Sequence, residues 1–271
     1  PTVSPAGALS YTPAANANGS ATITLRLNDD GSGTPPNVNQ SATQTFTITV
    51  TAVNDAPGFT AGPNQTVDED AGPQTINPWA TAISAGPPDE SGQAVSFEIS
   101  NNSNAALFSA VPAVSPTGVL SYTPAANANG VATITLRARD DGGTANGGVD
   151  ASATQTFTIT VNAINDAPSF TVGPNQTVNE DAAAQTVNPW ATALNDGDPE
   201  LTQALSFVIT ANSNAALFST APAVSPAGVL TYTPAANANG SATITLRIQD
   251  DGSSTPPNVN TSATQTFTIT V

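Results

Sequence analysis

The feature that most constrains this chain is its internal repetition. The segment YTPAANANG begins at residues 11, 122 and 232, and the segment SATQTFTITV begins at residues 41, 152 and 262. Successive copies are therefore 111 and then 110 residues apart. A period of this length is too long for one turn of a solenoid and is typical of one sandwich-sized domain per repeat.

The repeats predict a partial domain followed by two complete ones. We place the C-terminal part of a repeat at residues 1–54, a complete repeat at 55–165 and another at 166–271. Residues 1–54 hold only the later motifs of a repeat, so we expect unpaired strand edges there. Either the segment is cut from a longer chain, or another molecule completes its sandwich by adding strands.

Within each repeat, apolar and polar residues alternate with a period of two. Ile244, Leu246 and Ile248 alternate with Thr245 and Arg247, which predicts a strand with one buried and one exposed face. Clusters of Gly, Pro, Asn and Asp separate such runs, so about seven short strands per repeat and an all-β sandwich or barrel are expected. In the last repeat the strands are predicted at 176–179, 186–192, 204–210, 216–219, 228–233, 242–249 and 266–271.

Aromatic residues recur at fixed places in the repeats. Trp79 and Trp190 each follow Asn-Pro, and Tyr11, Tyr122 and Tyr232 each open a Tyr-Thr-Pro turn. An exposed Trp would provide a platform for stacking a sugar ring. One large aromatic in a small sandwich is more often part of its core, so we predict buried Trp and Tyr side chains.

The composition excludes several classes of function. Twenty carboxylates against four arginines give a net charge of −16, and Lys, His, Cys and Met do not occur. Nucleic acid is not an expected partner, because phosphate binding needs clustered cations. Without His, Cys or Lys to work with the carboxylates, we do not expect an enzyme. No apolar run approaches the ~20 residues of a membrane-spanning helix.

The acidic residues recur in pairs between apolar runs and do not form blocks. Asp-Asp-Gly stands at 29–31, 140–142 and 250–252. Asp and Gly suit solvated turns for backbone reasons alone, which is one interpretation of these triplets. Adjacent carboxylates in a chain with few charged residues also suit a bound cation, which is the other.

The run LRARDDGGTANGGVDASATQTFTITVNAINDAPSF, at residues 136–170, resembles the end of a cadherin repeat continuing through its linker into the next repeat. Similar units with a GVLTYTPAANANG-type turn occur in tandem in very large bacterial surface and secreted adhesins. The resemblance covers essentially the whole chain. It implies tandem Ig-like, cadherin-like β-sandwiches arranged end to end, an extracellular or cell-surface location, and calcium bound between neighbouring domains.

Carried over by position, the resemblance implies oxygen ligands around Asn54-Asp55-Ala56-Pro57 and Asn165-Asp166-Ala167-Pro168, because calcium needs six to eight oxygens. The implied ligands are Glu69 and Glu180 on first strands, Asn54, Asp55, Asn165 and Asp166 in the linkers, Asp196 and Asp198 in an early loop, with Glu200 nearby, and Asp140 and Asp250 in the Asp-Asp-Gly triplets.

The chain also departs from the cadherin pattern. Ala163 stands where the cadherin linker has a further Asp, and residues 201–249 hold no carboxylate. One or two ions per joint, and not three, are therefore expected. The early loop of the middle repeat, SAGPPDESG, contains only Asp89 and Glu90. We therefore expect the joint at 165–168 to be a better cation site than the joint at 54–57.

These patterns favour non-enzymatic extender repeats of a bacterial adhesin-like protein, stiffened by calcium at the joints. The expected partners are calcium ions and neighbouring repeats of the same chain. The alternative is a module that binds a cell-surface ligand such as a glycan, or other copies of itself through strand complementation of residues 1–54.

Overall fold

The computed structural model describes residues 1–199 and 201–271, so Glu200 lies outside the described residues. These residues form two compact units, which are described separately. The first comprises Pro1–Gln65, Gly72–Thr123 and Val131–Thr160, and the second comprises Thr66–Ala71, Pro124–Gly130 and Val161–Val271.

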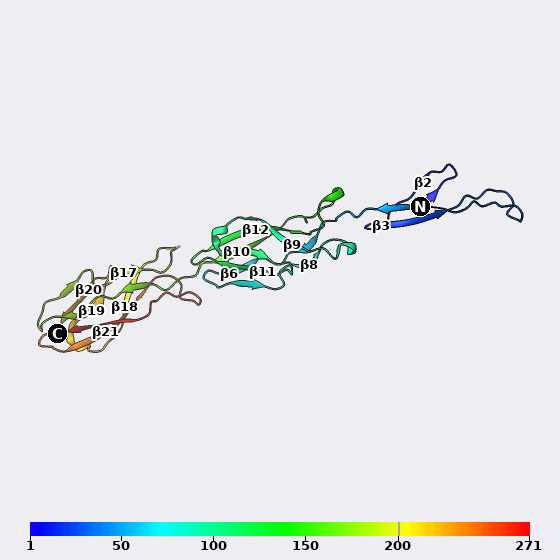
Figure 1. Ribbon diagram of the computed structural model, residues 1–271. Helices are drawn as coiled ribbons and strands as arrows, with labels where there is room; N and C mark the ends of the chain where they lie inside the picture. The colour runs from blue at the N-terminus through cyan, green and yellow to red at the C-terminus, as the bar shows by residue number, and fades with distance from the viewer. Residues whose placement is uncertain (200) are drawn as a thin grey trace. The chain divides into compact units, whose positions relative to one another are not determined.

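The second unit contains the whole third repeat, which is a β-sandwich (Figure 1). One sheet has the strand order β15-β22-β21-β18, the other has the order β16-β20-β19, and β14 pairs with β17 in a small third sheet. The strands are β14 (Ser169–Thr171), β15 (Gln176–Thr177), β16 (Gln185–Val187), β17 (Thr192–Asn195), β18 (Ser206–Asn212), β19 (Phe218–Val224), β20 (Leu230–Pro234), β21 (Ser241–Gln249) and β22 (Gln265–Thr270), and a 3₁₀ turn, η4 (Ala215–Leu217), precedes β19.

Strand β21 is central to this sandwich because it pairs antiparallel with both β18 and β22. Ile244, Leu246 and Ile248 are all 0% exposed, whereas Thr243 on the opposite face is exposed. The predicted alternation is therefore confirmed. Strand β15 pairs with β22 in parallel, which closes the other edge of the sheet.

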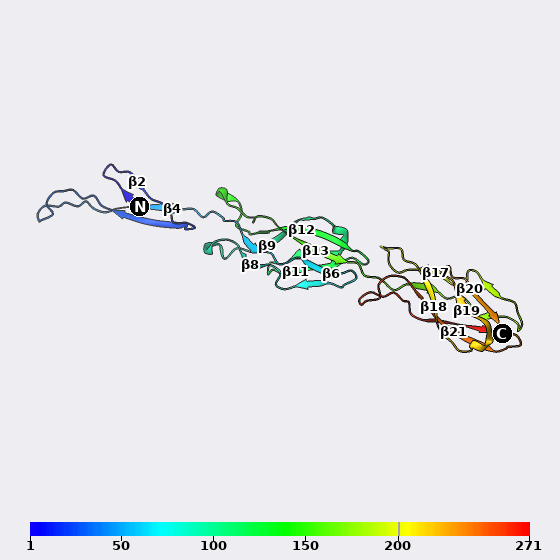
Figure 2. The same cartoon turned by 180° about the vertical axis from the view of Figure 1, so that it is seen from behind.

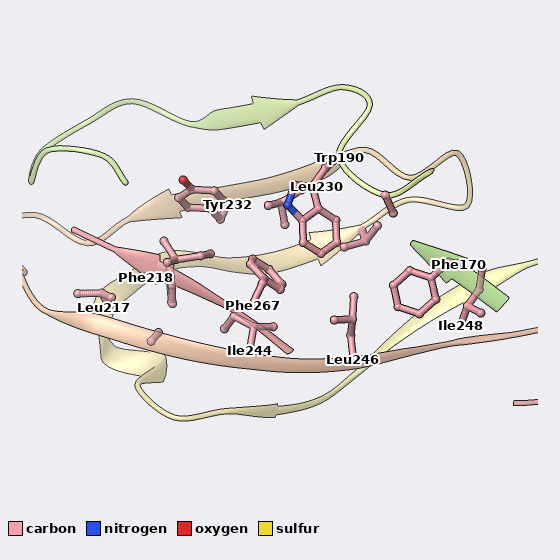
Figure 3. Close-up of a cluster of buried hydrophobic side chains, with 14 residues drawn as sticks. Phe170, Trp190, Leu217, Phe218, Leu230, Tyr232, Ile244, Leu246, Ile248 and Phe267 are labelled. Atoms are coloured by element: carbon pink, nitrogen blue, oxygen red, sulfur yellow. The ribbon is translucent and has the colours of Figure 1, made fainter. Parts of the chain in front are cut away.

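The core lies between the two sheets and contains aromatic residues from both (Figure 3). Trp190 is 2% exposed, and its ring centroid lies 4.3 Å from that of Phe267. Tyr232, 1% exposed, makes an edge contact with Phe218 at 5.9 Å. The prediction that Trp190 and Tyr232 belong to the core is therefore confirmed, whereas it is wrong for Tyr11, which is 49% exposed in the partial repeat.

Two strand predictions for the third repeat need correction. The strand expected at 186–192 is two strands, β16 and β17, separated by Asn188-Pro189-Trp190. Proline lacks the backbone N–H that a sheet ladder needs, so the ladder stops there. The strand expected at 216–219 begins as the 3₁₀ turn η4 and becomes extended only from Phe218. Strand β14 was not predicted.

The first unit contains most of the middle repeat, which has the same sheets: β6-β13-β12-β9, β10-β11-β7 and β5-β8 (Figure 2). Trp79 packs on Phe157 with ring centroids 4.4 Å apart. The elements are β5 (Gly58–Thr60), β6 (Gln65–Asp68), β7 (Gln74–Ile76), β8 (Thr81–Ser84), η1 (Pro88–Glu90), β9 (Ser96–Asn102), η2 (Ala105–Leu107), β10 (Phe108–Val114), β11 (Leu120–Pro124), β12 (Gly130–Arg139), η3 (Ala145–Gly147) and β13 (Gln155–Asn162).

Residues 1–50 form two separate strand pairs. Strand β1 (Thr2–Val3) pairs with β2 (Leu9–Ser10), and β3 (Gly19–Leu25) pairs with β4 (Gln44–Val50). The apolar side of β3 and β4 is not covered as it is in the complete repeats. Ile23 is half-buried, whereas its counterparts Ile134 and Ile244 are 0% exposed.

The three copies of this isoleucine give a matched test of the core. We expect Ile244→Ala to destabilise the third repeat by about 2–5 kcal/mol, because it leaves a cavity in a packed core. Ile23→Ala should cost far less, since its site is open. Urea unfolding followed by Trp190 fluorescence in a Trp79→Phe background measures the first change, and circular dichroism measures both. Equal costs at the two positions would contradict the burial described here.

Candidate functional site

Asn165 is anchored to the loop that follows β21. Its side-chain amide donates to Asp250 Oδ1 at 3.2 Å and to the Val259 carbonyl at 3.0 Å. Its backbone N–H donates to Asn258 Oδ1 at 2.7 Å, and its carbonyl accepts from the Val259 N–H at 2.8 Å. Asn165 is 6% exposed, so its side chain is buried and hydrogen-bonded at the start of the third repeat. We call this asparagine, together with its contacts to the loop after β21, the asparagine plug.

The same plug explains the glycine of the Asp-Asp-Gly triplet. A Cβ on Gly252 would overlap Asn165 Oδ1, and a Cβ on Gly142 would overlap Asn54 Oδ1. Glycine is therefore required by the close approach of the asparagine side chain. The Asp-Asp-Gly triplet is therefore both a turn between strands and part of the joint.

The residue before the plug is held by Glu69. The Ile164 N–H donates to Glu69 Oε1 at 2.7 Å, and the Glu69 N–H donates to the Asn162 carbonyl at 2.9 Å. Glu69 is 3% exposed, and its other oxygen, Oε2, is buried without a hydrogen-bond partner among the described residues. Consecutive residues, Ile164 and Asn165, are thus held by residues from different repeats.

Carboxylates converge around Asp166. Partial burial, and then the negative charges of Asp70 and Asp198, raise the pKa of Asp166 above its ordinary value. Asp198 accepts from Gln203 Nε2 at 3.0 Å, and the same amide donates to Asn165 Oδ1. Asp250 Oδ2 and Gln203 Oε1 are buried without partners in the described chain. The joint therefore holds uncompensated negative charge and unpaired oxygens.

The joint at 54–57 repeats the plug with different neighbours. The Asn54 amide donates to Asp140 Oδ1 at 2.8 Å, and Asn54 Oδ1 accepts from Gln93 Nε2 at 2.8 Å. Glu90 is 7% exposed, and its Oε1 accepts from the Asp55 N–H at 2.8 Å. Glu90 Oε2 and Asp140 Oδ2 are buried without partners in the part of the chain described.

The structure brings most of the expected ligands into these two places. Asn165, Asp166, Asp198, Asp250 and Glu69 meet around residues 164–166, and Asn54, Asp55 and Asp140 meet around residue 54. Asp196 accepts from the Gln203 N–H at 2.8 Å, whereas Glu180 is exposed. Among residues 1–199 and 201–271, no group of three or more acidic side chains is close enough together to hold a metal ion.

Three polar residues of these joints were not selected from the sequence. Gln93 and Gln203 close the hydrogen-bond networks on Asn54 and Asn165. Both stand before Ala in equivalent places of the two repeats, which is the only signal in the sequence. Glu90 was noted in its loop but not assigned to the site, because nothing in the sequence showed that η1 turns it inward.

A second polar constellation lies on the exposed face of the middle repeat. Glu98 Oε2 accepts from Arg137 Nε at 2.9 Å and also pairs with Arg139, whose Nη1 lies 3.1 Å from Asp150 Oδ2. These two arginines lower the pKa of Glu98 from 4.5 to about 2. In the third repeat the corresponding residues are Val208, Arg247, Gln249 and Asn260.

We expect Asn165→Ala to lower the free energy of unfolding of the third repeat by about 1–3 kcal/mol, because it strands the Asp250 carboxylate and the Gln203 amide. Denaturant unfolding read by Trp190 in a Trp79→Phe background measures the change. Asn179→Ala, at an exposed position, is the control and should change little. Equal effects at positions 165 and 179 would contradict the plug.

The lowered pKa of Glu98 predicts a pH-dependent contribution to the stability of the middle repeat. The folded state holds the ionised carboxylate more strongly than the unfolded chain does. The contribution is therefore complete above pH 4.5 and is lost as pH falls through about 2. Glu98→Gln should lower the melting temperature read by Trp79 at pH 7 and have little effect near pH 2. A difference that does not change with pH would rule out the ion pairs as its cause.

The comparisons with known proteins agree with this architecture. Residues 165–271 match the model of the family described as bacterial Ig domain. No curated protein matches the chain in sequence. Among the described residues, none of the helices has the length and apolar character needed to cross a bilayer.

Among solved structures, the chain is similar to cadherin ectodomains. Mouse protocadherin-24 EC1-3 is 16% identical with a TM-score of 0.44, over 93% of this chain and 79% of that one. Human protocadherin-24 EC1-2 is 16% identical with a TM-score of 0.47, over 80% of this chain and 99% of that one. Mouse cadherin-23 EC22-24 is 18% identical with a TM-score of 0.42, over 92% and 74%. The strand topology of the two complete repeats and the matched family model confirm the expected tandem Ig-like β-sandwich repeats.

Proposed function

We propose that this chain consists of non-enzymatic extender repeats of an extracellular, adhesin-like bacterial protein. The observation that carries the proposal is the joint at 164–166. Ile164 is held by Glu69 of the middle repeat, and the next residue, Asn165, is held by the third repeat. A linker in which consecutive residues are hydrogen-bonded to two different repeats contains no unattached residue between these two contacts. Such a linker suits a spacer.

The route of the chain through the third repeat supports the same function. Asn165 enters beside Asp250, at the end of β21. The last strand, β22, begins where Gln265 donates to the Phe170 carbonyl and ends where Val271 pairs with Gly240, before the start of β21. The chain therefore enters and leaves at opposite ends of the sandwich, so such repeats can be joined in line.

We further propose that the joint at residues 164–166 binds calcium. The donors available there are carboxylate and amide oxygens, which are the ligands that calcium prefers. Glu69 Oε2 and Asp250 Oδ2 are buried without a partner among the described residues, and the pKa of Asp166 is raised partly by neighbouring carboxylates, so a cation there would satisfy these oxygens and offset the charge. The donor chemistry therefore fits the ion.

We assign calcium binding at this joint to Glu69, Asp166, Asp198 and Asp250, with Asp70 nearby. A bound cation would neutralise their mutual repulsion and tie oxygens from both sides of the linker together. Because the described residues do not form a group of three or more ligands, binding requires these side chains to move closer. At the Asn54 joint the available carboxylates are those of Asp55, Glu90 and Asp140. We still predict that this joint binds calcium more weakly than the joint at residues 164–166.

The alternative is a module that binds a ligand or another copy of itself. Strands β3 and β4 form a two-stranded sheet, whose outer edges and half-covered apolar side support strand addition at residues 1–50. Both Trp79 and Trp190 are 2% exposed, which removes them as platforms for stacking a sugar. The extender function therefore remains the better supported of the two.

Small-angle scattering of the chain with calcium and with EGTA tests the proposal. We expect chelation to shorten the maximum dimension, and Glu69→Gln to remove most of this calcium effect, because it deletes a charge at the joint. Glu180→Gln is the matched control, since Glu180 occupies the same place in the third repeat but is exposed.

The outcomes separate the two parts of the proposal. An unchanged maximum dimension on chelation overturns the calcium assignment but leaves a hydrogen-bonded spacer. A maximum dimension no larger than that of collapsed, mutually packed domains, with or without calcium, overturns the extender function itself.

A further inference from the structure

Arg247 stands on the exposed face of the third repeat without a partner. In β21 it lies opposite Val208 of β18. Among residues 1–199 and 201–271 its guanidinium makes neither a hydrogen bond nor an ion pair, and its Nε is shielded from solvent as well. A shielded donor that nothing accepts costs free energy. The terminal Nη groups of the same guanidinium are not among the buried atoms and can receive a ligand.

The middle repeat shows which chemical group fits this position. Arg137 occupies the same place in β12, lies opposite Glu98 of β9, and binds its carboxylate at 2.9 Å. In the third repeat, Val208 replaces Glu98 and Asn260 replaces Asp150. The guanidinium is retained while every carboxylate that could neutralise it is lost.

The surrounding face is free of negative charge. Residues 201–249 and 252–271 contain no carboxylate, although the whole chain carries a net charge of −16. The acids of this repeat are confined to sequence positions 166, 180–181, 196–200 and 250–251, outside strands β15, β18, β21 and β22. An anion that approaches Arg247 along the sheet therefore meets the least repulsive part of the repeat.

Hydroxyl and amide groups flank Arg247 on the same face. Thr245 and Gln249 are its neighbours two residues away on β21, and Ser206 and Thr210 lie on β18. The Thr210 hydroxyl donates to the Thr245 carbonyl at 3.3 Å and keeps its oxygen lone pairs as acceptors. One cation among neutral donors and acceptors matches a carboxylated sugar, whose ring carries hydroxyls beside its charge.

We propose that the Arg247 face of the third repeat binds the uronate residues of an acidic polysaccharide. The Nη groups of the guanidinium bind the carboxylate beside Val208, and Thr245, Gln249 and Ser206 hydrogen-bond the sugar hydroxyls. Without an exposed tryptophan, each site is weak and gains strength only when it is repeated along a polymer.

NMR titration of the whole chain with trigalacturonate tests the proposal, with maltotriose and sodium acetate as controls. We expect the Arg247 Nε–H signal to shift with trigalacturonate and to saturate with a Kd on the order of 1 mM. Maltotriose should produce no shift, and acetate should bind at least about tenfold more weakly, since it lacks the hydroxyl contacts.

The decisive variant is Val208→Glu, which supplies the internal carboxylate that the middle repeat already has. We expect it to weaken trigalacturonate binding at least about tenfold, as Arg247→Gln also should. Val208→Thr, which is neutral and suits a strand, is the control and should bind as the parent does. Dispersion of the amide spectrum checks that each variant is folded.

Three results would overturn the proposal. The first is no shift of the Arg247 signal with trigalacturonate. The second is equal affinity for acetate, which would show a simple anion site. The third is a shift that depends on protein concentration without any ligand, which would show that a second copy occupies the face.

Discussion

The buried asparagine at the start of each complete repeat is the interaction on which both the domain and its joint depend. Asn165 joins the entering chain to the loop after β21 through its side-chain amide, its backbone N–H and its carbonyl. The loop can close on it only because residue 252 is glycine. Asn54 makes the equivalent contacts with Asp140 and Val149.

That plug also determines what the neighbouring acids can do. One oxygen of Asp250 accepts from the amide of Asn165, while its other oxygen is buried and has no partner in the described part of the chain. In Glu69, likewise, one oxygen accepts from the Ile164 N–H, and the other has no partner among residues 1–199 and 201–271. Such half-used carboxylates hold the linker without metal and retain lone pairs for a cation. Structural and metal-binding roles are therefore compatible in the same residues.

The repeats differ most on their exposed faces and least in their cores. Trp79 with Phe157 and Trp190 with Phe267 pack at almost the same distance, 4.4 and 4.3 Å. By contrast, Glu98 and Asp150 of the middle repeat become Val208 and Asn260 in the last one. Core positions are constrained by close packing from all sides, whereas a face open to solvent can change its charge without disturbing the sandwich. Repeats with the same core can therefore differ in the charge of their exposed faces.

The sequence by itself determined the repeat length, the all-β class, the alternation in β21 and the burial of Trp190 and Tyr232, because each follows from local periodicity and residue type. It also identified the acids near the joints. Pro189 already signalled the strand break at Asn188-Pro189-Trp190, whereas only the tertiary structure decided that Glu90 turns inward on η1. Gln203 closing on Asn165 and Arg247 losing its partner were likewise decided there. These features depend on which residues 35 or more positions apart in sequence meet in the fold, and a local pattern does not contain that information.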